Sequence, residues 1–315
     1  MSAKNGQMLN ARRLMIAPMP AGADESEVFV PGLLKNQVIL VTGGGTGLGK
    51  ATAMELARCG ARVLIAGRRT EVLEAAVAEA TDLLQDSPGP GALDWAAADV
   101  RDRSSAEQLV RTTVERCGRL DVLVNNAGGQ YFTPAELIAT KGWRAVWRLN
   151  VEGMLNMAEA AFDLALAPAR SGMVINVTLS PHHGMPGMAH SGAARATVEA
   201  LTSELAQRWH DSRVCATAVA AGHFLTEVLI KYPEPVRAAT ARSVPVQRQG
   251  QPIEHAWLVT LLASPLGPAF NGSTVTLDGA RDNWAGSWPP PGLAGESGEV
   301  PIEERRPSCA GARDA

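Results

Sequence analysis

The sequence lacks the features that would mark a membrane, metal-binding or general nucleic-acid-binding protein. No apolar run reaches the ~18 residues that a membrane-spanning helix needs. The four cysteines contain no CxxC pair, so no metal centre is predicted, and scattered thiols favour a reducing, cytoplasmic setting. The net charge at pH 7 is −3, whereas nucleic-acid binding calls for a basic field. We therefore expect no metal, no nucleic acid and no membrane among its partners.

What is present is the composition of a chain that can bury a sizeable core. Hydrophobic residues make up 46% of the sequence and charged residues 19%. Residues 1–32 and 289–315 are irregular, and the second segment is rich in proline, glycine and charge. We interpret them as a flexible leader and an irregular tail. Residues 33–288 are expected to form a single domain.

Short apolar runs alternate with helical patterns through this domain. Continuous apolar strands separated by helices are typical of a parallel sheet that is covered on both faces. Right-handed crossovers then give an α/β fold of the doubly wound Rossmann type. Strands are predicted at residues 37–41, 62–66, 93–97, 120–124, 172–177, 213–219 and 274–277, and helices at residues 49–58, 70–84, 104–117, 143–164 and 192–209.

A glycine-rich segment, TGGGTGLG at residues 42–49, lies between the first predicted strand and the first predicted helix. Glycines allow a tight turn and a close approach of the backbone to a pyrophosphate, which the positive end of the helix stabilises. The residues expected to form this cradle are Thr42, Gly43, Gly45, Thr46, Gly47, Leu48 and Gly49.

The TGxxxGxG spacing and three later motifs resemble the short-chain dehydrogenase/reductase superfamily, over residues 33–279. Asp99-Val100 ends the third strand, NNAG at residues 125–128 ends the fourth, and Asn150 is followed by Gly153. The resemblance implies that Asn150 belongs to the catalytic set. It also implies a dinucleotide site that includes Asp99, Val100, Asn126, Ala127, Gly128, Gly222 and Thr226.

The end of the second strand distinguishes the two common dinucleotides. A carboxylate at this point would bind the ribose 2′-hydroxyl of NAD. Here the sequence is Ala66-Gly67-Arg68-Arg69, with no acid. Because a guanidinium can pair with a 2′-phosphate through two hydrogen bonds, Arg68 and Arg69 favour NADP(H).

The resemblance fails at the family's usual catalytic pair, a tyrosine followed four residues later by a lysine. Ser191 aligns with the tyrosine and Arg195 with the lysine, and the chain has no other tyrosine than Tyr131 and Tyr232. A serine hydroxyl is a far weaker acid than tyrosine, whose free pKa is about 10. Arg195 can bind ribose hydroxyls, so it is also expected at the cofactor, but it stays protonated.

Other residues are therefore candidates for the missing proton donor. The segment 176–184 is two residues longer than the family's common form, which leaves either Thr178 or Ser180 facing the substrate. Histidines at 182, 183 and 190 titrate near neutrality. The predicted catalytic candidates are Asn150, Thr178, Ser180, His190, Ser191, Arg195 and, at the nicotinamide end, Tyr131.

The residues that depart from the family's usual catalytic pair resemble a particular branch of the superfamily. HSGAAR at residues 190–195 and NNAGGQ at 125–130 are similar to peroxisomal trans-2-enoyl-CoA reductases and to citronellol dehydrogenase-like proteins. This resemblance implies NADPH-dependent reduction of an enoyl thioester, with a small-molecule substrate such as an acyl-CoA. Two alternatives stay open: carbonyl or alcohol redox with a substitute acid, and NADP binding without redox turnover. The superfamily resemblance also implies a homodimer or homotetramer.

Overall fold

Seven strands form one parallel sheet in the part of the chain that the computed structural model describes, which is residues 26, 28–85, 91–180, 187–227, 229, 244–246 and 248–282. The strand order is β3-β2-β1-β4-β5-β6-β7, and every neighbouring pair is parallel. The strands are β1 Val38–Thr42, β2 Arg62–Gly67, β3 Ala92–Ala97, β4 Val122–Asn125, β5 Gly172–Leu179, β6 Val214–Ala221 and β7 Thr274–Leu277. The predicted doubly wound Rossmann fold is confirmed.

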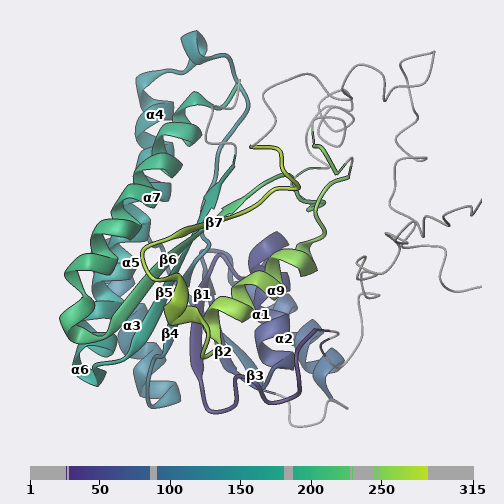
Figure 1. Cartoon of the computed structure of the whole chain (residues 1–315), viewed down its shortest axis with the longest axis vertical. Helices are drawn as coiled ribbons and strands as arrows, with labels where there is room; N and C mark the ends of the chain where they lie inside the picture. The colour runs from purple at the N-terminus through teal and green to yellow at the C-terminus, as the bar shows by residue number, and fades with distance from the viewer. Residues whose placement is uncertain are drawn as a thin grey trace, which may run out of the picture.

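Helices cover both faces of the sheet, so that the core has two layers (Figure 1). On one face α1, α2 and α9 pack against strand residues such as Ile39 and Val124. On the other face α3, α5 and α7 pack against residues such as Leu40 and Leu123. The principal helices are α1 Gly47–Arg58, α2 Thr70–Leu84, α3 Arg103–Cys117, α4 Thr140–Trp147, α5 Gly153–Ala161, α6 Ala167–Ala169, α7 Ala189–Arg208 and α9 Pro252–Ala263.

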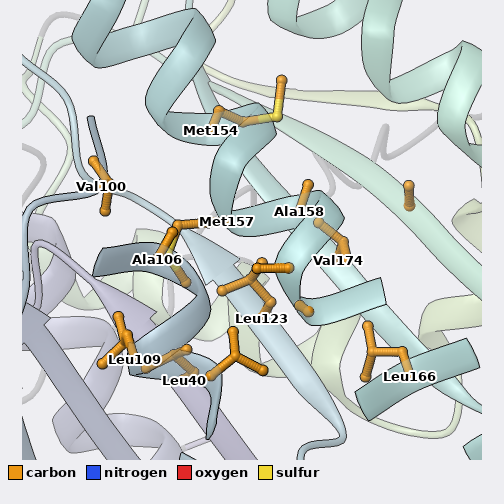
Figure 2. Packing of buried hydrophobic residues seen from close by; sticks show 14 of the residues in the cluster. Leu40, Val100, Ala106, Leu109, Leu123, Met154, Met157, Ala158, Leu166 and Val174 are labelled. Carbon is orange, nitrogen blue, oxygen red and sulfur yellow. The ribbon is translucent and has the colours of Figure 1, made fainter. Parts of the chain in front are cut away.

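Alternation along the central strands explains these two layers. Successive side chains of a strand point to opposite faces. A run such as VILVT in β1 therefore contributes side chains to the core layers on both faces and is buried throughout. Figure 2 shows Leu40 beside Leu109 of α3, and Leu123 below Met157 of α5. Full burial of one leucine side chain stabilises the fold by roughly 1.5–3 kcal/mol.

The helices depart from the sequence prediction in three places. Helix α9 was not predicted, although Gln251 and Glu254 form a capping box before it. The predicted helix at 143–164 begins earlier, at Thr140, and is interrupted by π-helical turns at Arg148–Glu152 and Phe162–Leu166. Helix α7 begins at Ala189, three residues before the predicted start. In the described residues no helix is long and apolar enough to cross a membrane.

Helix α9 packs against α1 through a buried histidine. The Nδ1 atom of His255 lies 3.2 Å from the hydroxyl oxygen of Thr52, and neither side chain is exposed. The His255 ring also meets the ring of Phe224 edge to face at 5.8 Å between centroids. Phe224, which follows strand β6, therefore packs against His255 of α9.

The burial of His255 predicts how stability depends on acid. Desolvation lowers its pKa from 6.5 to about 4. At pH values between these two pKa values, His255 binds a proton in the unfolded chain but not in the folded chain. The free energy of unfolding therefore falls as the pH falls through this window. The difference is on the order of 3 kcal/mol. We expect His255→Gln to lose less stability than the parent between about pH 7 and pH 5, measured by urea unfolding.

The matched control is His210→Gln, because the His210 side chain is exposed. It should follow the parent across the same range. Equal pH slopes for His255→Gln and the parent would contradict the burial of an uncharged imidazole between α1 and α9.

Candidate functional site

A cleft of about 530 Å³ opens at the carboxyl ends of the strands. In an open parallel sheet, ligands bind at this edge, where the strand order changes direction. Here that point lies between β1 and β4, which continue the sheet on opposite sides. The predicted site residues that line the cleft are Gly43, Gly45, Thr46, Gly47, Leu48, Gly49, Arg68, Arg69, Asp99, Val100, Asn126, Ala127, Gly128, Thr178, Arg195, Gly222 and Thr226.

Thr42 lies beneath the cleft and holds two strand ends together. Its hydroxyl oxygen accepts hydrogen bonds from the backbone N–H groups of Asn126 and Ala127, at 3.1 and 3.0 Å. In return, Asn126 Nδ2 donates to the carbonyl oxygens of Thr42 and Gly43, at 3.0 and 3.3 Å. The glycine-rich loop after β1 is thereby fixed against the loop after β4.

The loop requires glycines because its backbone lies too close to neighbouring atoms to leave room for a Cβ atom. A Cβ atom on Gly49 would lie 2.3 Å from the carbonyl oxygen of Gly43 and 2.4 Å from Asn126 Nδ2. Gly43 and Gly47 have φ values of +67° and +53°, which favour glycine. The loop leads into the first turn of α1, whose N–H groups suit an anion. The residues present therefore fit the pyrophosphate of a dinucleotide.

The end of the cleft that follows β2 carries positive charge. Arg68 and Arg69 follow β2 and are exposed, and neither forms a salt bridge with any residue that the structure describes. The nearby carboxylate of Asp99 is held by Arg101, with Nε and Nη2 contacts of 2.9 and 2.5 Å. These hydrogen bonds lower the pKa of Asp99 to about 2. Asp99 is thus an anion already paired with an arginine.

Asn150 holds the loop after β4 from the π-helical turn. Its Nδ2 donates to the carbonyl oxygens of Val146 and Gly129, at 2.8 and 2.9 Å. Its Oδ1 accepts from the Gly129 N–H at 3.2 Å. The side chain is 2% exposed and does not line the cleft. Asn150 therefore fixes the loop that contains Gly128 and Gly129, which line the cleft.

Arg195 brings a positive charge into the cleft from α7. Its Nη1 donates to the carbonyl oxygen of Val177 at 2.7 Å. A Cβ atom on Gly128 would lie 2.3 Å from Nη2, so the guanidinium lies directly against the loop after β4. Burial lowers the pKa of Arg195 to about 10, which leaves the group cationic at neutral pH. It cannot act as a base there.

The candidate hydroxyls point in different directions. Ser191 is completely buried, and its Oγ lies 3.5 Å from Oε1 of the cleft residue Gln130. Thr178 lines the cleft and donates to Glu199 Oε1 at 2.7 Å. Ser180 donates instead to the Asp278 carboxylate at 2.5 Å and is not a lining residue. Of the two residues left open by the sequence, Thr178 is the one at the cleft.

His190 and Tyr131 pack together outside the cleft lining. Their ring centroids are 4.5 Å apart, and Trp143 approaches the same imidazole at 6.1 Å. Burial lowers the pKa of His190. The Tyr131 hydroxyl lies against Gly142 of α4, since a Cβ atom there would be 1.9 Å from it. His182 and His183 lie outside the described residues.

Several cleft residues were not predicted from the sequence. Gln130 lines the cleft and accepts a hydrogen bond from Ser191, and Glu199 accepts a hydrogen bond from the lining residue Thr178. His223 follows β6 and lines the cleft, where burial and the charge of Arg281 lower its pKa to about 4. His223 directly follows Gly222, a position that the family pattern had already indicated. Glu199 has no such sequence signal.

Comparisons with known proteins identify the family. Residues 37–236 match the short chain dehydrogenase family. A probable 2,4-dienoyl-CoA reductase of Bacillus subtilis is 33% identical over 262 residues, or 81% of this chain and 100% of that protein. A 3-oxoacyl-[acyl-carrier-protein] reductase of Thermotoga maritima is 31% identical over 78% of this chain and 98% of that protein. Among solved structures, a citronellol catabolism dehydrogenase of Pseudomonas aeruginosa is 35% identical, with a TM-score of 0.71 over 82% of this chain and 99% of that one.

The crowding at Gly49 leads to a prediction about cofactor binding. Gly49→Ala should weaken the binding of NADPH or NADH at least tenfold, because the methyl group collides with the loop that faces the pyrophosphate. The measurement is a fluorescence titration of the reduced cofactor. Gly192→Ala is the matched helical control, since a Cβ atom there meets nothing within 4 Å. Equal affinities for Gly49→Ala and the parent would exclude the loop as the phosphate cradle.

Proposed function

The chain belongs to the short-chain dehydrogenase family, and on that premise we propose that it uses NADPH to reduce a conjugated acyl thioester of the enoyl-CoA class. The choice of reaction depends on Ser191, which is predicted to stand at the position of the family's tyrosine and is a buried and very weak acid beside Gln130. The relatives named for 2,4-dienoyl-CoA reduction support the substrate class.

The charges at the end of β2 support NADPH. Arg68 and Arg69 line the cleft there, and both are exposed to a ligand. The nearest acid, Asp99, is already engaged by Arg101. A 2′-phosphate would find two guanidinium groups and no competing free carboxylate at this point.

The weak acids of the site support conjugate reduction over carbonyl reduction. NADPH, when bound, would supply a hydride. Carbonyl reduction leaves an alkoxide that must be protonated, and the Ser191 hydroxyl is a very weak acid for that task. Reduction of a conjugated thioester delocalises negative charge onto the thioester oxygen, which hydrogen-bond donors stabilise without giving up a proton. The Gln130 amide and Arg195, which both line the cleft, are such donors.

Carbonyl or alcohol redox is the second candidate, because one similar structure is named a citronellol catabolism dehydrogenase. His190, the substitute acid that this reaction would use, is 1% exposed and packed against Tyr131 rather than lining the cleft. This position weighs against it. Binding of NADP without turnover has no structural observation in its favour.

We also propose that the chain is a cytoplasmic homo-oligomer. Trp143 and Trp147 lie one turn apart on α4 and are 37% and 39% exposed. Large aromatic side chains on one exposed helix face are typical of protein interfaces. Among the residues that the structure describes, the cysteines at positions 59, 117 and 215 are free, which suits a reducing compartment.

The proposed reaction is tested by following NADPH oxidation with trans-2-enoyl-CoA and 2,4-dienoyl-CoA esters, and in parallel with medium-chain aldehydes and ketones. Mass spectrometry identifies the products. We expect loss of one carbon–carbon double bond from the thioesters and much slower reduction of isolated carbonyls. An alcohol as the main product would replace the proposal with carbonyl redox.

The cofactor preference is tested at Arg68. Arg68→Gln should raise the KM for NADPH about tenfold, or roughly 1.4 kcal/mol of binding, and leave the KM for NADH nearly unchanged. Arg62→Gln is the control, because Arg62 is an exposed arginine at the other end of the same strand. A parallel change for both cofactors would show that Arg68 does not meet the 2′-phosphate.

A further inference from the structure

The carboxylate of Asp278 joins the segments that follow β5, β6 and β7. Its Oδ2 atom accepts hydrogen bonds from the Ser180 hydroxyl at 2.5 Å and from the backbone N–H of Asp282 at 2.7 Å. Gly222, which follows β6 and lines the cleft, lies so close that a Cβ atom on it would be 2.6 Å from the Asp278 Cα atom. Asp278 is 9% exposed. The three strand ends are therefore fixed relative to one another at this edge of the cleft.

His223 is the next residue along the chain after Gly222, and its backbone is held in place. Its carbonyl oxygen accepts the N–H of Gly250 at 2.8 Å, and the Gly250 carbonyl accepts the N–H of Leu225 at 2.8 Å. His223 lines the cleft and is half-buried. No residue that the structure describes forms a hydrogen bond with either of its imidazole nitrogens. A polar side chain without a protein partner at a cleft is available to a ligand.

The imidazole of His223 is uncharged at neutral pH. Burial lowers its pKa most, the charge of Arg281 lowers it further, the carboxylate of Asp278 opposes both, and the resulting pKa is about 4. Arg281 is half-buried, and its Nε atom has no hydrogen-bond partner in the described part of the chain. A neutral imidazole has one N–H donor and one acceptor nitrogen. His223 therefore offers the cleft a neutral donor in the field of a cation.

The other ionisable side chains of the described cleft lining carry charge. They are Arg68, Arg69, Asp99 and Arg195. A thioester oxygen has lone pairs and no proton, so it pairs with an N–H group rather than with an acceptor. A neutral N–H suits the uncharged thioester, and the charge of Arg281 stabilises the negative charge that develops on the oxygen during reduction. A thioester oxygen is therefore the ligand group that fits His223.

We propose that His223 is a catalytic residue that donates a hydrogen bond from its imidazole N–H to the thioester oxygen of the substrate. This inference rests on the proposed function. The donor acts where negative charge collects after the hydride adds to the β-carbon. The imidazole keeps its proton throughout, and the α-carbon takes its proton from water, so that charge and atoms balance.

The first test compares substitutions that remove or keep the donor. His223→Phe keeps a ring and removes the N–H, and we expect kcat/KM for trans-2-enoyl-CoA to fall about 100-fold, as for loss of an oxyanion donor. His223→Gln keeps an N–H group and should lose less than tenfold. The NADPH dissociation constant should change less than twofold in both. His210→Phe and His210→Gln are the matched controls, because the His210 side chain is exposed, and both should retain the parent kcat/KM.

The second test follows the imidazole itself and needs no turnover. NMR of the parent protein with isotope-labelled histidine shows the His223 ring, assigned by the signal that is lost in His223→Gln. With NADP+ present, a saturated acyl-CoA should shift this signal, whereas free CoA, which has no thioester carbonyl, should leave it in place. Thermal unfolding of each variant verifies that it folds.

The outcomes distinguish this inference from the proposed function. A His223→Phe variant with more than half the parent kcat/KM, a loss expressed mainly in NADPH affinity, or an equal shift of the His223 signal by acyl-CoA and CoA would overturn the role of His223. If the parent reduces carbonyls and not conjugated thioesters, the proposed function fails. The NMR comparison then still decides whether His223 binds a thioester oxygen.

Discussion

The cleft depends on the reciprocal hydrogen bonds between Thr42 and Asn126. The Thr42 hydroxyl receives two N–H groups from the loop after β4, and the Asn126 amide returns hydrogen bonds to the carbonyls at the start of the glycine-rich loop. Buried polar groups are costly unless they are paired, so this pairing fixes the two loops at one separation. That separation sets the room between Gly43, Gly49 and the first turn of α1. The glycine-rich loop after β1 and the loop after β4, which contains Gly128, therefore form a single unit that lines the cleft.

Around this unit, charge determines the chemistry that is available. The exposed Arg68 and Arg69 place positive charge at one end of the cleft, while Arg195 places a cation at the other. The Ser191 hydroxyl, which is predicted to stand at the position of the family's tyrosine, is buried and lies beside Gln130. Fixed cations and neutral hydrogen-bond donors suit a reaction that spreads negative charge onto oxygen.

The sequence predicted the parts of this arrangement that local pattern determines. Apolar runs mark the strands because buried parallel strands are apolar on both faces, and the glycine loop marks the cradle because backbone approach excludes a Cβ atom. Helix α9 was missed because its apolar residues follow no clear period, although its capping box was readable. Tyr131 was expected in the nicotinamide region, but packing against His190 and Gly142 determines where its ring lies. The link from Thr178 to Glu199 joins a strand to a helix 21 residues later, and no local spacing predicts such a tertiary contact.

The proposed reaction requires that this cleft direct a hydride to the β-carbon of a conjugated thioester. The most direct measurement uses NADPH that carries deuterium at the transferable C4 position, with trans-2-enoyl-CoA as substrate and mass spectrometry and NMR of the product. We expect a saturated acyl-CoA with one deuterium at the β-carbon. Deuterium on a carbinol carbon, with the conjugated double bond retained, would contradict it.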